Sequence, residues 1–314
     1  MNSLRNKKNK IVVLRYHSIK DDPSRHAYYI GGISLSCTNF EKHMEIISKK
    51  YDPVSIDELQ YLLENCFDDQ KKYVCVTFDD GFKDNAENAI PIMNKYGIKC
   101  TIYVSTNFVK KGYLWFLLTR NAFYKTQKKI WIDQSVGKSY NLLDKHEKRA
   151  AFLRVVSICC SSCVEDIDLY IRKILDDLDV DDVLGDGAKP LTQSDILSIR
   201  SQGHIIGSHT VGHPNMAHID LNQAQIEAEE SKNFLESILK ENVFHFSYPS
   251  PYLQPIHNIN TKNILIHSGY KTAVTCDHGV VNSRTDSYSI PRCVVPADKT
   301  DFNFLLEKLF FNGK

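Results

Sequence analysis

Residues 73–81, Tyr73-Val74-Cys75-Val76-Thr77-Phe78-Asp79-Asp80-Gly81, form the stretch around which the rest of the chain is organised. It is a short apolar run of strand length that ends abruptly in two carboxylates and a glycine. Burying carboxylates without partners is costly, so the arrangement is a poor source of stability. It is a good basis for a metal or proton-transfer site, provided that other parts of the chain supply partners for Asp79 and Asp80.

Composition sets broad limits on fold and function. The 314 residues are 42% hydrophobic and 25% charged, as in an ordinary globular protein with a large core. The net charge of +1 gives no reason to expect a nucleic-acid partner. We find no secretory signal and no apolar run of the about 18 residues that a transmembrane segment needs. Nine cysteines, several in strand-like contexts, favour reduced thiols and a cytoplasmic protein.

Strand-like and helix-like segments alternate along most of the chain. We expect strands at 10–17, 73–78, 99–105, 203–207, 243–248, 271–275 and 288–295. Helices are expected at 38–50, 55–65, 84–96, 192–201, 221–240, 255–268 and 301–311, with Thr38, Ser55 and Thr192 as N-caps and a loop at 18–37. This α/β rhythm favours a parallel sheet closed into a barrel. A doubly wound open sheet is the alternative, although no G-x-G-x-x-G follows a strand.

Residues 106–190 depart from this rhythm. They contain Trp115, Trp131 and two helix-like segments, at about 143–161 and about 164–178. We interpret them as a helical insertion with a small hairpin in a single catalytic domain that spans residues 1–314. The insertion either overhangs the site as a lid or substrate wall, or it is structural decoration.

The ends of three predicted strands carry candidate site residues: Asp79-Asp80, His209-Thr210-Val211-Gly212-His213 and Ser247-Tyr248-Pro249. In a parallel barrel all carboxyl ends of the strands meet on one face. One Asp and two His form an open, three-ligand shell that leaves a position for water, as a hydrolytic zinc-type site requires. The second aspartate would then lie near that water and could act as a general base.

The motifs Thr-Phe-Asp-Asp-Gly at 77–81 and Gly-Ser-His-Thr-Val-Gly-His-Pro at 207–214 resemble the polysaccharide deacetylase family, the NodB-like domain of carbohydrate esterase family 4. The segments 14–19, 246–249 and 269–275, with the late Ile290-Pro291-Arg292, resemble the subgroup that acts on exopolysaccharide and surface-sugar intermediates. The resemblance implies a deformed (β/α)7 barrel. It also implies metal-assisted removal of an N- or O-acyl group from a sugar.

Individual roles follow from the same resemblance. It implies that Asp79 is the catalytic base and that Asp80, His209 and His213 bind a divalent metal, usually Zn²⁺, with Co²⁺, Ni²⁺ or Mn²⁺ as other candidates. The backbone N–H of Ser250 would help to hold the oxyanion. Tyr248 is a candidate for stacking on the sugar.

The chain departs from the family pattern in the group that orients the base and in the catalytic acid. Ser247 stands where many members have an arginine that orients the base, and Arg292 either substitutes for that arginine or is an ordinary ion-pair residue. No clear L-x-H-D motif supplies a catalytic acid. His17, at the end of the first strand, is the leading candidate for the acid, and His278 is the second.

These observations predict a metal-dependent deacylase, either a deacetylase or a deformylase, that hydrolyses the N-acyl group of an amino sugar. In a cytoplasmic protein the substrate would be a nucleotide-linked or lipid-linked sugar or a short oligosaccharide, as an intermediate of a surface polysaccharide or glycoconjugate. Two alternatives stay open. One is a metal-dependent amidohydrolase that acts on a small non-sugar amide, and the other is a non-catalytic carbohydrate-binding member of the fold.

Overall fold

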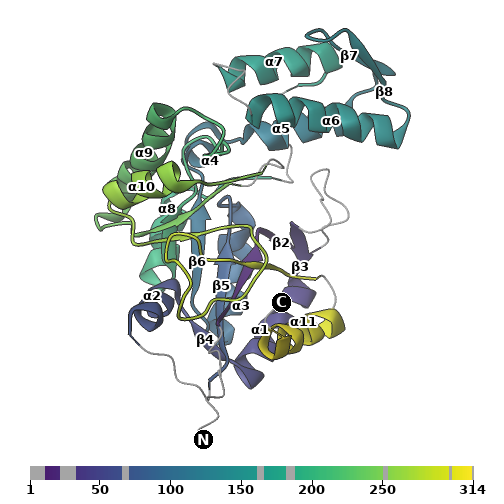
Figure 1. The fold of residues 1–314 in the computed structure, drawn as a ribbon. Coiled ribbons are helices and arrows are strands. Elements are labelled where there is room, and N and C mark those ends of the chain that lie inside the picture. The colour runs from purple at the N-terminus through teal and green to yellow at the C-terminus, as the bar shows by residue number, and fades with distance from the viewer. Residues whose placement is uncertain are drawn as a thin grey trace, which may run out of the picture.

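A parallel β-sheet forms the centre of the molecule (Figure 1). The computed structural model describes residues 11–21, 33–65, 71–160, 166–181, 188–249, 254–296 and 299–312. The strands of the central sheet are β1 (Ile11–Tyr16), β4 (Asp52–Val54), β5 (Tyr73–Phe78), β6 (Cys100–Val104), β9 (Ile205–Ser208), β10 (His245–Ser247), β11 (Thr272–Val274) and β12 (Cys293–Val294). Their order is β11-β10-β9-β6-β5-β1-β12, and β4 pairs with the start of β5.

The sheet curves so that its two ends approach each other. Ile290 forms a parallel bridge with Val274 of β11, and Cys293 of β12 pairs with Leu14 of β1. The segment that leads into β12 therefore spans the gap between the first and last strands. Strand order follows chain order from β5 to β11 without the reversal of a doubly wound sheet. The prediction of a deformed (β/α)7 barrel is confirmed, in the form of a parallel half-barrel surrounded by helices.

Side chains alternate between the inside of the barrel and its outer faces, as the period of a strand requires. The interior holds a small apolar cluster that includes Val13, Cys75 and Tyr103, whereas Val12 and Leu14 belong to the larger core beneath the helices. Continued to the carboxyl ends of the strands, this alternation brings polar side chains into the barrel: Arg15, Thr77, Asp79, His209 and Ser247. One end of the barrel is therefore apolar and the other is polar.

Helices cover the outer faces of the sheet (Figure 1). They are α1 (Cys37–Lys50), α2 (Ile56–Glu64), α3 (Ile90–Lys95), α8 (Gln193–Ser201), α9 (Leu221–Leu239), α10 (Ile259–His267) and α11 (Lys299–Asn312). The N-caps predicted at Ser55 and Thr192 are confirmed, and both are capping boxes. The first cap was predicted wrongly: Ser36, rather than Thr38, accepts a hydrogen bond from the backbone N–H of Asn39, so α1 begins earlier.

Other boundaries also differ from the sequence prediction; the strand expected at 288–295, for example, is only Cys293–Val294. The helix expected at 84–96 begins with a π-helical turn, Asn85–Ala89, before α3. The helix expected from 255 begins only at Ile259, where the side chain of Asn258 caps it. The expected loop at 18–37 contains β2 (Ser18–Lys20) and β3 (Ser34–Ser36), which form a small parallel sheet, while residues 22–32 lie outside the described part.

The insertion forms its own layer at one end of the molecule (Figure 1, upper right). It consists of α5 (Trp115–Lys125), the antiparallel hairpin β7 (Ile130–Asp133) and β8 (Lys138–Asn141), α6 (Lys145–Cys160) and α7 (Ile167–Leu178). These elements pack around a hydrophobic cluster that includes Trp115 and Trp131. The short helix α4 (Thr106–Lys111) precedes this layer and lies beside α9. The two helices and the hairpin predicted for this segment are confirmed.

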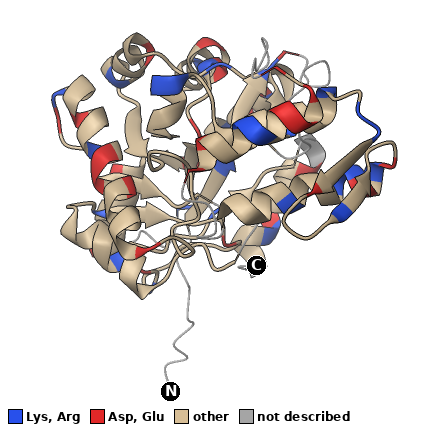
Figure 2. Cartoon of the chain, turned by 90° about the horizontal axis from the view of Figure 1, so that it is seen from above, with Lys and Arg blue, Asp and Glu red and all other residues tan. Residues whose placement is uncertain are grey.

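Three further expectations concerned surface charge, membrane-spanning segments and the state of the cysteines. Acidic and basic residues are interspersed on the peripheral helices (Figure 2). In the described part of the chain, each helix is too short or too polar to cross a bilayer. Cys75, Cys100 and Cys293 are buried free thiols, and Cys276 is a half-buried one.

Candidate metal and catalytic site

Asp80, His209 and His213 converge at the polar end of the barrel, although about 130 residues separate the first from the others. The Nε2 atoms of His209 and His213 lie 3.5 Å and 3.4 Å from Asp80 Oδ1. One ligand atom from each side chain lies within 4.8 Å of the other two. All three side chains are buried, so this is an enclosed set of one oxygen and two nitrogen donors.

The donor set fits a divalent cation better than it fits hydrogen bonding. His209 Nδ1 lies 2.7 Å from the carbonyl oxygen of Ser247, to which it can only donate, so a neutral ring turns a bare Nε2 toward Asp80. Asp80 Oδ1 is buried without a hydrogen-bond partner in the described structure. Ligands about 2.1 Å from a tetrahedral ion are separated by about 3.4 Å, which matches both Asp80–His separations.

Charge at this cluster is set by its neighbours. Burial by itself would raise the pKa of Asp80, but the two histidines bring it well below its usual value, so the carboxylate stays ionised. Burial lowers the pKa of His213, which favours the neutral imidazole that a metal requires. Both shifts leave the side chains in their metal-binding protonation states near neutral pH.

The backbone at this cluster is strained. Asp80, Thr210 and His213 have φ angles of 75°, 68° and 60°, in the left-handed region that residues with a Cβ rarely adopt. Each such residue costs on the order of 1–3 kcal/mol and persists only where its surroundings fix it. Gly81 continues the turn at φ 87°, and a Cβ there would lie 3.1 Å from Val104 Cγ1. The glycine of the Asp-Asp-Gly motif is thus required by conformation and by close packing.

A buried carboxylate of α9 holds the loop that carries both histidines. Glu227 accepts hydrogen bonds of 2.8 Å from the backbone N–H groups of Val211 and Gly212. Within the loop, Thr210 Oγ1 accepts a bond of 2.9 Å from the N–H of His213. Burial raises the pKa of Glu227, against the opposing effect of these two backbone donors. Sequence reasoning missed this residue, although a Glu in the buried stripe of an amphipathic helix was a usable signal.

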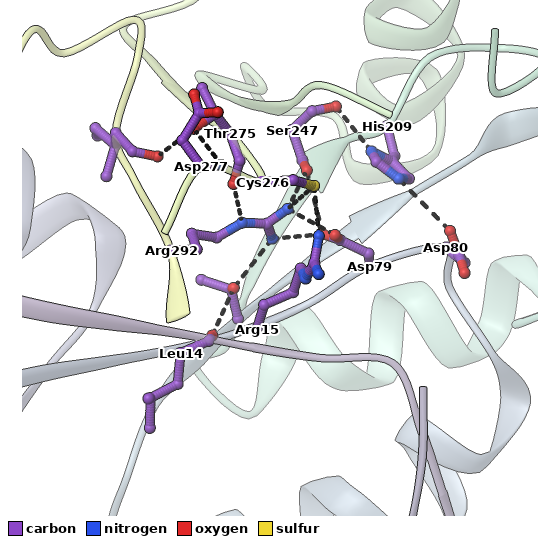
Figure 3. A network of polar contacts seen from close by, with 12 residues as sticks. Leu14, Arg15, Asp79, Asp80, His209, Ser247, Thr275, Cys276, Asp277 and Arg292 are labelled. Carbon is purple, nitrogen blue, oxygen red and sulfur yellow. Dashed lines mark hydrogen bonds and ion pairs between the residues drawn. The ribbon is translucent and has the colours of Figure 1, made fainter. Parts of the chain in front are cut away.

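Asp79 is held by Arg292 (Figure 3). Arg292 donates from Nη1 to Asp79 Oδ1 at 2.7 Å and from Nη2 to Oδ2 at 2.6 Å. Both side chains are almost completely buried. Burial by itself would raise the pKa of Asp79, but the Arg292 guanidinium and His209 bring it below its usual value. Of the two roles considered for Arg292, the geometry matches that of an arginine that orients Asp79.

Ser247 makes room for this arrangement. Its hydroxyl accepts from Arg292 Nη2 at 3.0 Å and donates to Asp79 Oδ1 at 3.2 Å, while its carbonyl oxygen accepts from His209. A small side chain on β10 thus leaves space for the guanidinium that arrives from the residue before β12. The same serine links the Asp79 pair to the histidine loop.

The two candidates for the acid differ in position. His17 follows β1, one residue beyond the pairing of Tyr16 with Phe78, which places it beside Asp79. Burial lowers the pKa of His17 from 6.5 to about 4, although the charges of Asp80 and Asp79 act in the opposite direction. His278 is exposed, and no contact joins it to the described cluster. Of the two, His17 alone lies near the carboxylates.

Of the two substrate-binding candidates, the structure describes Tyr248 alone. Tyr248 is fully buried and packs against Phe246 and His257, with ring centroids 5.3 Å and 4.9 Å away. Its ring lies in the core because β10 turns this position away from the barrel interior, so it offers no face to a sugar. Ser250 lies outside the described residues.

The insertion contacts the cluster directly. The ring of Phe116, on α5, lies 4.6 Å from that of His213 between centroids. A cavity of about 490 Å³ adjoins the same loop on the side of Glu227 and is lined by residues of both the insertion and α9, among them Trp115, Asp168 and Gly212. Sequence reasoning left open whether the insertion overhangs the site or is structural decoration, and it did not identify Phe116.

Fold and site together define a class: a deformed (β/α)7 barrel with an Asp-His-His cluster and an ion-paired aspartate at the carboxyl ends of its strands. The family model for polysaccharide deacetylase matches residues 68–273, which is more than half of the chain. The chain therefore belongs to the polysaccharide deacetylase family.

Individual relatives agree with this assignment. The chain is 21% identical over 284 residues to YxkH of Bacillus subtilis (strain 168), a protein assigned to the polysaccharide deacetylases, and the match covers 90% of this chain and 70% of that one. The structure is similar to that of the Streptococcus pyogenes deacetylase PplD in complex with acetate, with a TM-score of 0.65, 20% identity and coverage of 96% and 98%. It is also similar to IcaB from Ammonifex degensii, with a TM-score of 0.60, 17% identity and coverage of 95% and 96%.

Proposed function

We propose that this protein is a metal-dependent deacylase that removes the N-acyl group of an amino sugar, as a deacetylase or a deformylase. The observation that carries the proposal is the convergence of Asp80, His209 and His213 beside an aspartate that Arg292 holds in a fixed orientation. A carboxylate clamped next to three metal-type donors is suited to hydrolysis and contributes little to stability. Membership of the polysaccharide deacetylase family supports the same reaction class.

Asp80, His209 and His213 would hold the metal, and one oxygen with two imidazole nitrogens favours Zn²⁺, with Co²⁺, Ni²⁺ or Mn²⁺ as alternatives. Such an ion, when bound, supplies Lewis-acid polarisation of the acyl carbonyl and lowers the pKa of water. The hydrogen bond from His209 to Ser247 fixes the tautomer that presents Nε2 to the ion.

Asp79 would be the proton acceptor. Arg292 occupies one lone-pair direction on each carboxylate oxygen, and Asp79 Oδ2 accepts no second hydrogen bond in the described structure. A lone pair of Oδ2 thus stays available for a proton from the attacking water. The lowered pKa of Asp79 keeps the group ionised but makes it a weak base, so its contribution is the fixed position of the acceptor.

His17 would be the donor to the leaving amine. Its ring is neutral near pH 7 because burial lowers its pKa to about 4, so it must receive a proton during turnover. Its Nδ1 has no hydrogen-bond partner in the described structure and is available to take up that proton. The backbone N–H of Ser250 stays the proposed oxyanion donor, whereas the burial of Tyr248 removes the reason to assign it a stacking role.

The substrate would be an N-acylated sugar or oligosaccharide that is an intermediate of a surface polysaccharide or glycoconjugate. A cytoplasmic location also stays a prediction. No observation favours a small non-sugar amide or a non-catalytic binding role over deacylation.

The test is acyl release from a panel of N-acetyl and N-formyl amino sugars and small ureides, with the chelated and the metal-reloaded protein. We expect acetate or formate release from sugars that chelation abolishes and Zn²⁺ restores. Release from ureides alone would assign the protein to the small amidohydrolases. Binding of sugars without release by the metal-loaded protein would identify the non-catalytic alternative.

A further inference from the structure

The polar end of the barrel contains a second guanidinium besides that of Arg292. Arg15 is the residue before the last of β1, and strand alternation turns it into the barrel on the same side as Asp79. It is half-buried, and its polar contact is with the sulfur of Cys276 (Figure 3). Within the described residues no carboxylate lies at ion-pair distance from Arg15, whereas Arg292 forms a bidentate pair with Asp79.

The two arginines differ sharply in how their donors are used. Arg292 distributes its five N–H groups over five oxygen acceptors of Asp79, Thr77, Ser247 and Thr275. Arg15 has the same five donors and one sulfur acceptor, which is a weak one. A half-buried guanidinium beside Asp79, with one weak acceptor among the described residues, keeps most of its donors free for an anion that the chain itself does not supply.

Arg15 also borders a small space next to the proposed acid. A cavity of about 30 Å³ is lined by Arg15, His17, Ser18, Ser34 and Val295, among others. Half of its lining residues are apolar, Leu35 among them, so Arg15 is its cationic group. This volume holds about two water-sized groups, so one or two oxygens of an oxyanion fit and a sugar ring does not. A sugar whose acyl group lies at Asp79 could thus direct a charged substituent toward Arg15.

We propose that Arg15 binds an oxyanion, a carboxylate or a phosphate, carried by the N-acyl sugar, so that the preferred substrates are anionic amino sugars. The inference rests on the proposed function and narrows its substrate class. Planar guanidinium groups match carboxylates and phosphates in a bidentate manner, which makes arginine the suitable residue for either source. Neutral N-acyl sugars would still bind, but more weakly.

Binding to the metal-free protein tests the proposal without turnover. Calorimetric titration would use N-acetylglucosamine 1-phosphate as the phosphate probe, N-acetylmuramic acid as the carboxylate probe and the methyl glycoside of N-acetylglucosamine as the neutral one. For at least one anionic probe we expect Arg15→Gln to weaken binding about 10-fold to 100-fold and Arg15→Lys to weaken it less, with the neutral probe unaffected. The probe that responds identifies the source of the anion.

Two controls make the result specific. Arg200→Gln, on α8, breaks an exposed ion pair with Glu241, which follows α9, and should change no affinity. Cys276→Ser should keep the preference for anions, because the sulfur is only a neighbour of the guanidinium.

Equal effects of Arg15→Gln on charged and neutral probes, no effect on either, or loss of the preference in Cys276→Ser would overturn the proposal. Because the protein is metal-free, these results stand whether or not acyl release is observed. Failure of the Arg15 site is therefore distinguishable from failure of the deacylase assignment.

Discussion

Removing the guanidinium that holds Asp79 should strongly destabilise the protein. Arg292→Met keeps much of the side-chain volume but leaves the Asp79 carboxylate buried without its two charge-assisted bonds of 2.7 Å and 2.6 Å. Truncating one partner of a buried ion pair costs about 3–5 kcal/mol of unfolding free energy. The other three Arg292 bonds, to Thr77, Thr275 and Ser247, place the loss at the upper end of that range.

The assay is urea denaturation of the metal-free protein at pH 7, followed by circular dichroism. Arg292→Lys is the matched control, since it keeps the charge but cannot form the two parallel bonds. It should lose less unfolding free energy than Arg292→Met. In an Asp79→Asn background the cost of Arg292→Met should fall by more than half, because no charge is then left unpaired. A loss below about 1 kcal/mol, or the same loss in both backgrounds, would refute the reasoning.

Three further predictions concern groups around this pair. Glu227→Ala should weaken Zn²⁺ affinity about 10-fold to 100-fold, measured by competition with a chelator, while Glu227→Gln, which can still accept from the loop N–H groups, should lose less; equal losses would contradict the positioning role. Burial lowers the pKa of His204 from 6.5 to about 4, so its contribution to stability is complete above pH 6.5 and is lost as pH falls toward 4. His204→Gln should flatten that part of the stability–pH profile by up to about 3 kcal/mol, and an unchanged slope in urea titrations would count against it. Phe116→Ala should raise the KM for an N-acyl sugar by a larger factor than it lowers the Zn²⁺ content per chain. If only the Zn²⁺ content changes, the ring supports His213 and does not contact the substrate.

Much of the site could be predicted from the sequence because its parts lie at strand ends. A run of strand length followed by Asp79-Asp80, and a second by the His209–His213 motif, are local signals, and a parallel barrel brings such ends together. The barrel itself was predictable because βα units repeat with short connections.

The features that were not predicted depend on which residues meet in the folded chain, and local sequence patterns do not contain that information. Arg292 pairs with Asp79 across 213 positions of sequence, so only the closure of the barrel reveals which of its two roles applies. Tyr248 seemed available for stacking because it follows a strand toward the site, yet the pleat turns it into the core. The first helix begins near Ser36 instead of Thr38 because two capping residues compete within one turn, and it is the Ser36 side chain that accepts from the backbone N–H of Asn39.

The central claim is that Asp80, His209 and His213 hold one catalytic metal ion. Its most direct test is the metal content of purified protein, by plasma mass spectrometry after Zn²⁺ loading and gel filtration, measured together with acyl release. We predict about one ion per chain in the wild type and in Asp79→Asn, which should bind metal but not turn over. His209→Ala should bind almost none and be inactive while keeping its circular dichroism spectrum. Full metal occupancy in His209→Ala would contradict the proposed ligand set, and unchanged acyl release by its metal-free form would contradict the mechanism.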